Sequence, residues 1–129
     1  MSKQKNRKRA KKAGLICLVV IIALMIISLV YVGNYYHVQD REAALASTDN
    51  VMVEEVEYGY FFDGPGNDAA LIFYPGAKAE DLAYANLLKQ LAADGIDCYL
   101  VHMPGNLAFC GMNRADKVME TYSYDHWYL

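Results

Sequence analysis

The chain has few cysteines, and no arrangement of them suggests a metal site. Three occur among 129 residues: Cys17, Cys98 and Cys110. No spacing of Cys, His and acidic residues resembles a zinc ligand set, so we expect neither a metal nor another cofactor. Two cysteines outside the apolar segment are weak evidence for a disulfide. We interpret Cys98 and Cys110 as buried free thiols, with pairing in an oxidising compartment as the alternative.

Acidic residues are missing from the first twelve positions, which contain seven Lys or Arg. Residues 13–33, AGLICLVVIIALMIISLVYVG, then carry no charge. A helix of this length is about 30 Å long, the thickness of the hydrocarbon core of a bilayer. The sequence therefore predicts one transmembrane helix over 13–33. Because Lys and Arg beside such a segment stay on the cytoplasmic side, residues 1–12 are predicted to be a cytoplasmic tail and the rest of the chain extracytoplasmic.

A cleaved signal peptide is the competing interpretation of this segment. Signal peptides have an apolar region of about 7–15 residues that ends at a small-residue cleavage site. This apolar run is longer, and the Ala-x-Ala triplet at 44–46 lies well beyond its end. We therefore favour an uncleaved anchor in the cell membrane, with the lipid bilayer as its partner.

The region after the apolar segment is acidic. Residues 34–129 contain five Lys or Arg and all fifteen Asp or Glu, a formal charge of −10. Such a charge disfavours binding to nucleic acid. We interpret residues 34–50 as a juxtamembrane linker with a helical stretch at 39–46, and residues 51–129 as one small domain.

Strand-like and helix-like segments alternate within residues 51–129. Apolar and β-branched runs predict strands over 51–57, 58–63, 69–74, 96–103 and 125–129. Helical periodicity predicts helices over 79–94, with Glu80 and Asp81 in the first turn, and over 113–121, with Asn113 as the cap. Strands that alternate with helices indicate an α/β fold with a mostly parallel sheet and flanking helices.

Several short motifs follow one another in a distinctive order. They are LIFYPG at 71–76, AK at 77–78, AY at 83–84, HMP at 102–104, NLAF at 106–109, ADKV at 115–118 and HWY at 126–128. This order resembles the N-terminal half of a bacterial, membrane-anchored α/β-hydrolase family similar to the dienelactone hydrolases, over residues 58–129. The resemblance implies an eight-stranded, mostly parallel sheet and a Ser-His-Asp triad that hydrolyses an ester or related acyl bond. It also implies an oxyanion loop formed by the backbone of Gly76, Ala77 and Lys78.

The nucleophile expected from this resemblance is missing. A Gly-x-Ser-x-Gly elbow should follow the strand at 126–129, but the motif occurs nowhere in the sequence, whose serines are Ser2, Ser28, Ser47 and Ser123. No catalytic triad residue can be assigned. We therefore expect an N-terminal fragment of a serine esterase or acyl hydrolase, catalytically incomplete, which would act on a small acyl or ester substrate only together with a second half. The alternative is a small single-pass membrane binding module without catalysis.

Other reactive side chains have simpler interpretations. His102 ends a predicted strand, where sites of open α/β sheets gather, but a structural role is favoured. Lys78 could steer anionic substrates, yet a solvated loop lysine is favoured. The remaining candidates are interpreted as surface or packing residues: His37, His126, Asp116 and Lys117. Neither Cys98 nor Cys110 has an evident activating base.

Overall fold

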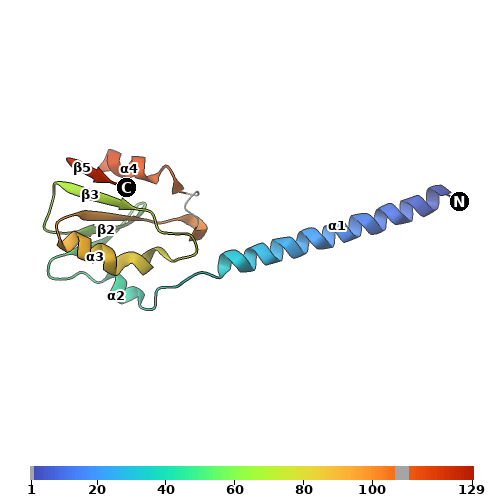
Figure 1. Cartoon of the computed structure of the whole chain (residues 1–129), viewed down its shortest axis with the longest axis horizontal. Coiled ribbons are helices and arrows are strands. Elements are labelled where there is room, and N and C mark those ends of the chain that lie inside the picture. The colour runs from blue at the N-terminus through green and yellow to red at the C-terminus, as the bar shows by residue number, and fades with distance from the viewer. Residues whose placement is uncertain (1, 107–110) are drawn as a thin grey trace. The chain divides into compact units, whose positions relative to one another are not determined.

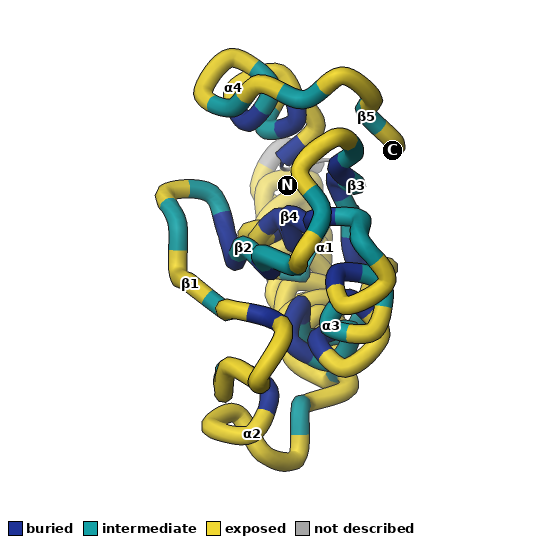
Figure 2. Tube along the Cα trace, turned by 90° about the vertical axis from the view of Figure 1, so that its left-hand side faces the viewer, coloured by how far each residue is buried: buried dark blue, intermediate teal, exposed yellow. Residues whose placement is uncertain are grey.

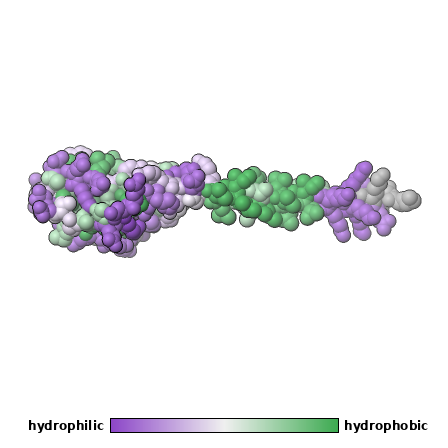
Figure 3. All heavy atoms as spheres, turned by 90° about the horizontal axis from the view of Figure 1, so that it is seen from below, coloured by the Kyte–Doolittle hydropathy of each residue, from purple (hydrophilic) through white to green (hydrophobic). Residues whose placement is uncertain are grey.

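The computed structural model describes residues 2–106 and 111–129, and the chain divides into two compact units. The first unit ends at Asn34 and contains helix α1 (Ser2–Gly33). By length and composition, the part from Asn6 to Gly33 could cross a membrane. The hydrophobic stretch of this helix follows the hydrophilic basic turns (Figure 3).

The second unit, Tyr35–Leu129, contains a five-stranded sheet, counted within the described residues. Its strands are β1 (Met52–Val56), β2 (Gly59–Asp63), β3 (Ala69–Phe73), β4 (Asp97–Val101) and β5 (His126–Tyr128). Its helices are α2 (Arg41–Leu45), α3 (Ala85–Ala93) and α4 (Arg114–Thr121), with short 3-10 turns η1 (Asp81–Tyr84) and η2 (Pro104–Asn106).

The strands are ordered β1-β2-β4-β3-β5. β2 is antiparallel to both β1 and β4, whereas β3 is parallel to both β4 and β5. Four of the five described strands thus run in one direction, and only β2 is reversed. The predicted α/β architecture with flanking helices is confirmed.

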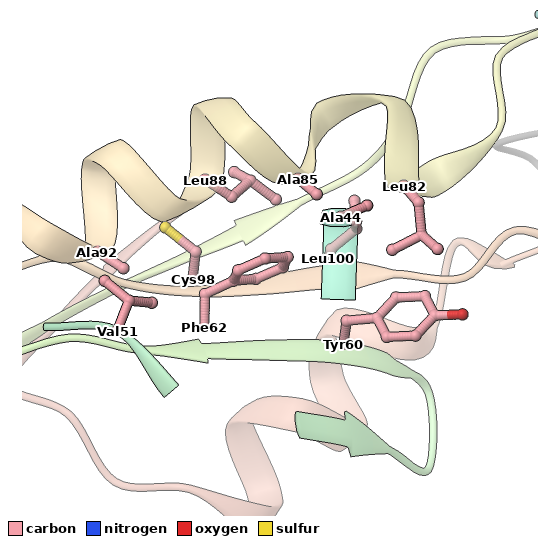
Figure 4. Close-up of a cluster of buried hydrophobic side chains, with 10 residues drawn as sticks. All are labelled: Ala44, Val51, Tyr60, Phe62, Leu82, Ala85, Leu88, Ala92, Cys98 and Leu100. Atoms are coloured by element: carbon pink, nitrogen blue, oxygen red, sulfur yellow. The ribbon is translucent and has the colours of Figure 1, made fainter. Parts of the chain in front are cut away.

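Helices α3 and α4 cover opposite faces of the sheet (Figure 1). The central strand β4 is buried on both faces, because its side chains alternate between two cores (Figure 2). Cys98 and Leu100 point toward α3, where Phe62 and Leu88 complete the first core (Figure 4). The second core, on the α4 side, contains Ala70, Ile72, Tyr99, Val101, Met103, Ala115 and Val118.

Two local predictions differ from the structure. The helix predicted over 79–94 begins only at Asp81, as a 3-10 turn, because Ala79 forms a parallel bridge with Tyr36 and Glu80 has extended backbone angles. Asn113 precedes α4 but makes no side-chain capping hydrogen bond. The helical stretch predicted within residues 39–46 corresponds to α2, which packs on the sheet through the buried Ala44.

Candidate functional site

The segment expected to be an oxyanion loop lies at the carboxyl end of β3. The strand ends at Phe73, and the buried Pro75 is followed by the exposed Gly76 and Ala77. Lys78 has a φ of 62°, in the left-handed region that residues with a Cβ seldom adopt. The chain therefore turns sharply here before it enters η1.

The three expected backbone donors are not equivalent. The N–H of Lys78 donates to the carbonyl of Asn106 at 3.4 Å, a long bond. Within the described residues, the N–H groups of Gly76 and Ala77 have no protein acceptor. Gly76 and Ala77 therefore differ from Lys78, whose N–H is already paired within the described residues.

The absence of a side chain at Gly76 matters for the neighbouring helix. A Cβ at this position would lie 3.1 Å from the hydroxyl oxygen of Tyr84, closer than most Cβ contacts. The Tyr84 ring is held against Phe73, with the ring centres 4.9 Å apart. A residue with a Cβ at position 76 would therefore require a small shift of the Tyr84 hydroxyl.

His102 and Asp81 meet beside this loop. His102 directly follows β4, and its Nδ1 lies 2.6 Å from Oδ2 of Asp81 in η1. The Asp81 carboxylate is buried, and its Oδ1 also accepts the N–H of Leu82 at 2.8 Å. The His102 side chain is 57% exposed, so its ring can be reached from solvent. The pair therefore connects the segment after β3, which contains Asp81, with the segment after β4, which contains His102.

The backbone of His102 is held by two further contacts. Its N–H donates to the carbonyl of Tyr58 at 2.8 Å, and its carbonyl accepts from the guanidinium of Arg114. The ammonium of Lys117 lies 5.2 Å from the centre of the Tyr58 ring, within the range of a cation–π contact. The start of α4 is thereby fixed to the end of β4.

The remaining sequence candidates do not join this group. His126 is exposed at the start of β5, and Asp116 and Lys117 are exposed on α4. His37 approaches Glu80, with Nδ1 3.7 Å from Oε2. Cys98 is a buried free thiol whose pKa is raised to about 12, first by burial and then by Asp97. A protonated thiol without access to solvent is not a nucleophile. Cys110 lies outside the described residues.

No serine sits in this loop. Ser28 belongs to α1, and Ser47 accepts the N–H of Val53 at 2.9 Å beside β1. Ser123 is exposed between α4 and β5. The loop after β3 therefore contains no serine that could act as nucleophile.

Sequence reasoning placed Glu80 and Asp81 in a helical first turn and missed their partners. Asp81 faces His102, and Glu80 accepts the N–H of Val38 at 3.0 Å and a guanidinium N–H of Arg41 at 3.2 Å. One signal could have indicated the first pair: segments that follow neighbouring parallel strands meet at the same edge of a sheet. Nothing in the sequence indicated the second.

Comparison with known proteins shows that part of the chain is similar to a hydrolase family. A family model described as the alpha/beta hydrolase family matches residues 70–129, from β3 to the end of the sequence. No curated protein and no solved structure matches the chain. The match covers the loop at Gly76–Lys78, the His102–Asp81 pair and β5, and it supports a hydrolase-like fold for this region.

Proposed function

We propose that this chain is the N-terminal part of a membrane-anchored serine acyl hydrolase, and that it supplies the oxyanion loop. The observation that carries the proposal is the loop after β3, within a region that matches the alpha/beta hydrolase family. In hydrolases of this fold, one oxyanion donor is an N–H of the loop after the third strand. Gly76 and Ala77 would provide it here.

The chemistry follows from the open N–H groups. Attack on an ester places a negative charge on the former carbonyl oxygen, and fixed N–H donors stabilise that charge more than the neutral substrate. The nucleophile, its base and the acid would come from residues that this sequence does not contain. The substrate class is a small acyl or ester compound, and α1 would hold the site at a membrane with the basic tail in the cytoplasm.

Two measurements on the native protein test the catalytic proposal. Membranes of the source cells would be solubilised, and the protein recovered with an antibody against residues 1–12. Its intact mass would be measured, and the sample treated with a fluorophosphonate that labels active serine hydrolases. We expect a labelled species well above 14.5 kDa, the mass of these 129 residues. An unlabelled species of 14.5 kDa would contradict hydrolase activity and favour a binding module.

The oxyanion role has its own test in the longer protein. Gly76→Pro removes the N–H of residue 76 and should lower kcat by about 10²–10³-fold, as loss of an oxyanion donor does. Gly105→Ala is the control, because a Cβ at position 105 meets no described atom within 4 Å. Equal activity of the two variants would argue against a role for this loop.

A further inference from the structure

Two residues with left-handed backbone meet at the end of the candidate oxyanion loop. Among the described residues, Lys78 (φ 62°) and Asn106 (φ 53°) are the two non-glycine residues with a positive φ. The N–H of Lys78 donates to the carbonyl of Asn106 at 3.4 Å. A Cβ disfavours this conformation, which persists only where surrounding contacts fix it, and such residues cluster at functional sites. The contacts that hold Lys78 are therefore candidates for a functional role.

Residues 36–41, which we call the strap, make backbone contacts of this kind. The N–H of Tyr36 donates to the carbonyl of Lys78 at 2.9 Å, and the N–H of Glu80 donates to the carbonyl of Tyr36 at 2.8 Å. These bonds form the parallel bridge between Tyr36 and Ala79. Both backbone polar groups of Lys78 are thus paired, its N–H with the segment after β4 and its carbonyl with the strap.

The Glu80 carboxylate adds side-chain bonds between the strap and the segment after the loop. Its Oε2 accepts the N–H of Val38 at 3.0 Å, and its Oε1 accepts a guanidinium N–H of Arg41 at 3.2 Å. Nδ1 of His37 lies 3.7 Å from the same Oε2. The Glu80 side chain is only 18% exposed, so its partly desolvated charge depends on these donors. Loss of the carboxylate would therefore release the strap at two positions.

Arg41 connects the strap to the sheet as well. Its second guanidinium nitrogen donates at 2.7 Å to the hydroxyl of Tyr60, a residue of β2 that is 5% exposed. Burial, followed by the charge of Asp81, raises the pKa of this hydroxyl. The ammonium of Lys89 in α3 donates to the carbonyl of Ala43 at 2.8 Å, which holds α2, the helix that begins within the strap. The strap is thus fixed to β2 and α3, and Glu80 connects it to the loop.

We propose that Glu80 and Arg41 are positioning residues for the candidate oxyanion donors. By fixing the strap they hold Lys78 in its left-handed conformation, and this sets the direction of the preceding N–H groups of Gly76 and Ala77. Donors that are already aligned stabilise a developing negative charge without reorienting during the reaction, and a displacement of about 1 Å can cost about 10²-fold in rate. The inference rests on the proposed function and deepens it, since neither residue acts on the substrate directly.

Amide hydrogen exchange of the full chain in detergent tests the structural step. Glu80→Ala removes the acceptor of Val38 and Arg41, and Arg41→Met removes the guanidinium while it keeps an unbranched side chain. Each variant should speed exchange of the Tyr36 N–H roughly tenfold, as loss of a hydrogen bond to a charged group allows, and leave the amides of β4 unchanged. Glu120→Ala, at an exposed position of α4, is the control and should change neither. Unchanged exchange at Tyr36 in both variants would overturn the proposal.

Steady-state kinetics of the longer protein, with p-nitrophenyl acetate as the ester, test the catalytic step. Glu80→Ala and Arg41→Met should each lower kcat about tenfold or more while KM stays within about twofold, because the donors act on the charge that develops in the transition state. Glu120→Ala should retain the kcat of the unsubstituted protein. A change confined to KM, or a kcat in both variants equal to that of the control, would contradict the positioning role.

Failure of this inference is distinguishable from failure of the proposed function. An unsubstituted protein that neither reacts with the fluorophosphonate nor hydrolyses the ester contradicts the proposed function, and the positioning role is then wrong as well. An unsubstituted protein that does both, with Glu80→Ala and Arg41→Met equally active, contradicts only the positioning role. Faster exchange at Tyr36 together with a lower kcat in the two variants is the combination that supports both.

Discussion

At the scale of single residues, the buried Asp97 organises the end of the sheet opposite the candidate loop. Its Oδ1 accepts the N–H of Gly64 at 2.9 Å, and its Oδ2 accepts the hydroxyl of Tyr124 at 2.7 Å. Asp97 is 2% exposed, so its desolvated charge depends on these donors. One carboxylate therefore joins the turn after β2, the start of β4 and the segment before β5.

Tyr124→Phe should destabilise the fold and reduce the loss of stability that the protein shows at alkaline pH. Loss of one donor to a buried carboxylate costs about 1–3 kcal/mol. Burial, with the hydrogen bond to Asp97 as a further cause, raises the pKa of Tyr124 to about 12. Between pH 10 and about 12 the unfolded chain releases this proton while the folded chain keeps it, so the free energy of unfolding falls as pH rises. The variant should lose part of that fall.

Urea unfolding at pH 8 and pH 11, followed by the fluorescence of Trp127, measures this effect. Trp127 is the single tryptophan and its ring lies 5.1 Å from that of Tyr124. Tyr128→Phe is the matched control, because Tyr128 is 52% exposed. An unchanged difference between the two pH values in Tyr124→Phe would refute the assignment of alkaline sensitivity to this hydroxyl.

His102→Ala should destabilise the sheet unit by about 1–3 kcal/mol, because the buried Asp81 carboxylate would keep only the N–H of Leu82. His126→Ala is the control: His126 is exposed, and a surface change of this kind usually stays within about 0.5 kcal/mol. Denaturant titration of the full chain in detergent compares them. Equal midpoints would mean that the His102–Asp81 contact contributes nothing to stability.

At the scale of elements, the apolar patterns predicted the fold well and the site poorly. The continuous run of residues 96–103 predicted a buried strand, and β4 is buried on both faces because α3 and α4 cover it. By contrast, Asp81 and His102 lie 21 positions apart, and their contact exists only after the crossover through α3 aligns the ends of β3 and β4. Local periodicity contains no information on such pairs.

The juxtamembrane segment shows the same limit. Nothing in the sequence indicated that Tyr36 uses its backbone atoms to bond Lys78 and Glu80. Every residue has these backbone groups, so composition cannot reveal the pairing. The displaced start of the helix after β3 is a direct consequence, because Ala79 is occupied in the bridge.

Two glycines in the connections between elements are needed for different reasons. At Gly64 a side chain would clash, whereas at Gly105 the backbone is left-handed. A Cβ at Gly64 would lie 1.8 Å from the carbonyl oxygen of Ala92, in the last turn of α3. Gly105 has a φ of 66° but open space around it among the described atoms. Gly64→Ala should cost about 3 kcal/mol or more, because backbone must move. Gly105→Ala should cost about 1–2 kcal/mol, from its left-handed backbone alone.

Thermal unfolding of both variants in the full chain measures this order. The midpoint should fall further for Gly64→Ala than for Gly105→Ala. The reverse order would mean that the contact between the turn after β2 and α3 adjusts more easily than a separation of 1.8 Å between the added Cβ and the Ala92 oxygen indicates.

At the scale of the whole molecule, the two units bury their apolar side chains to different extents. The apolar side chains of α1 are exposed in the chain itself, and the proposed membrane anchor would cover them with lipid. The sheet unit instead depends on its two internal cores, one on each face of the sheet. A temperature that unfolds the sheet unit need not therefore unfold α1.

Heating the full chain in nanodiscs should accordingly produce one cooperative transition of the sheet unit while α1 stays helical. Trp127 packs in the second core, so its fluorescence reports that unit alone. Circular dichroism at 222 nm reports all helices, of which α1, with 32 residues, is the longest. Since lipid cannot hydrogen-bond an unfolded backbone, unfolding α1 would leave its N–H and C=O groups unsatisfied in the bilayer. Most of the helical signal should therefore remain after the fluorescence change is complete. Simultaneous loss of both signals would show that α1 is held by the sheet unit and not by the bilayer.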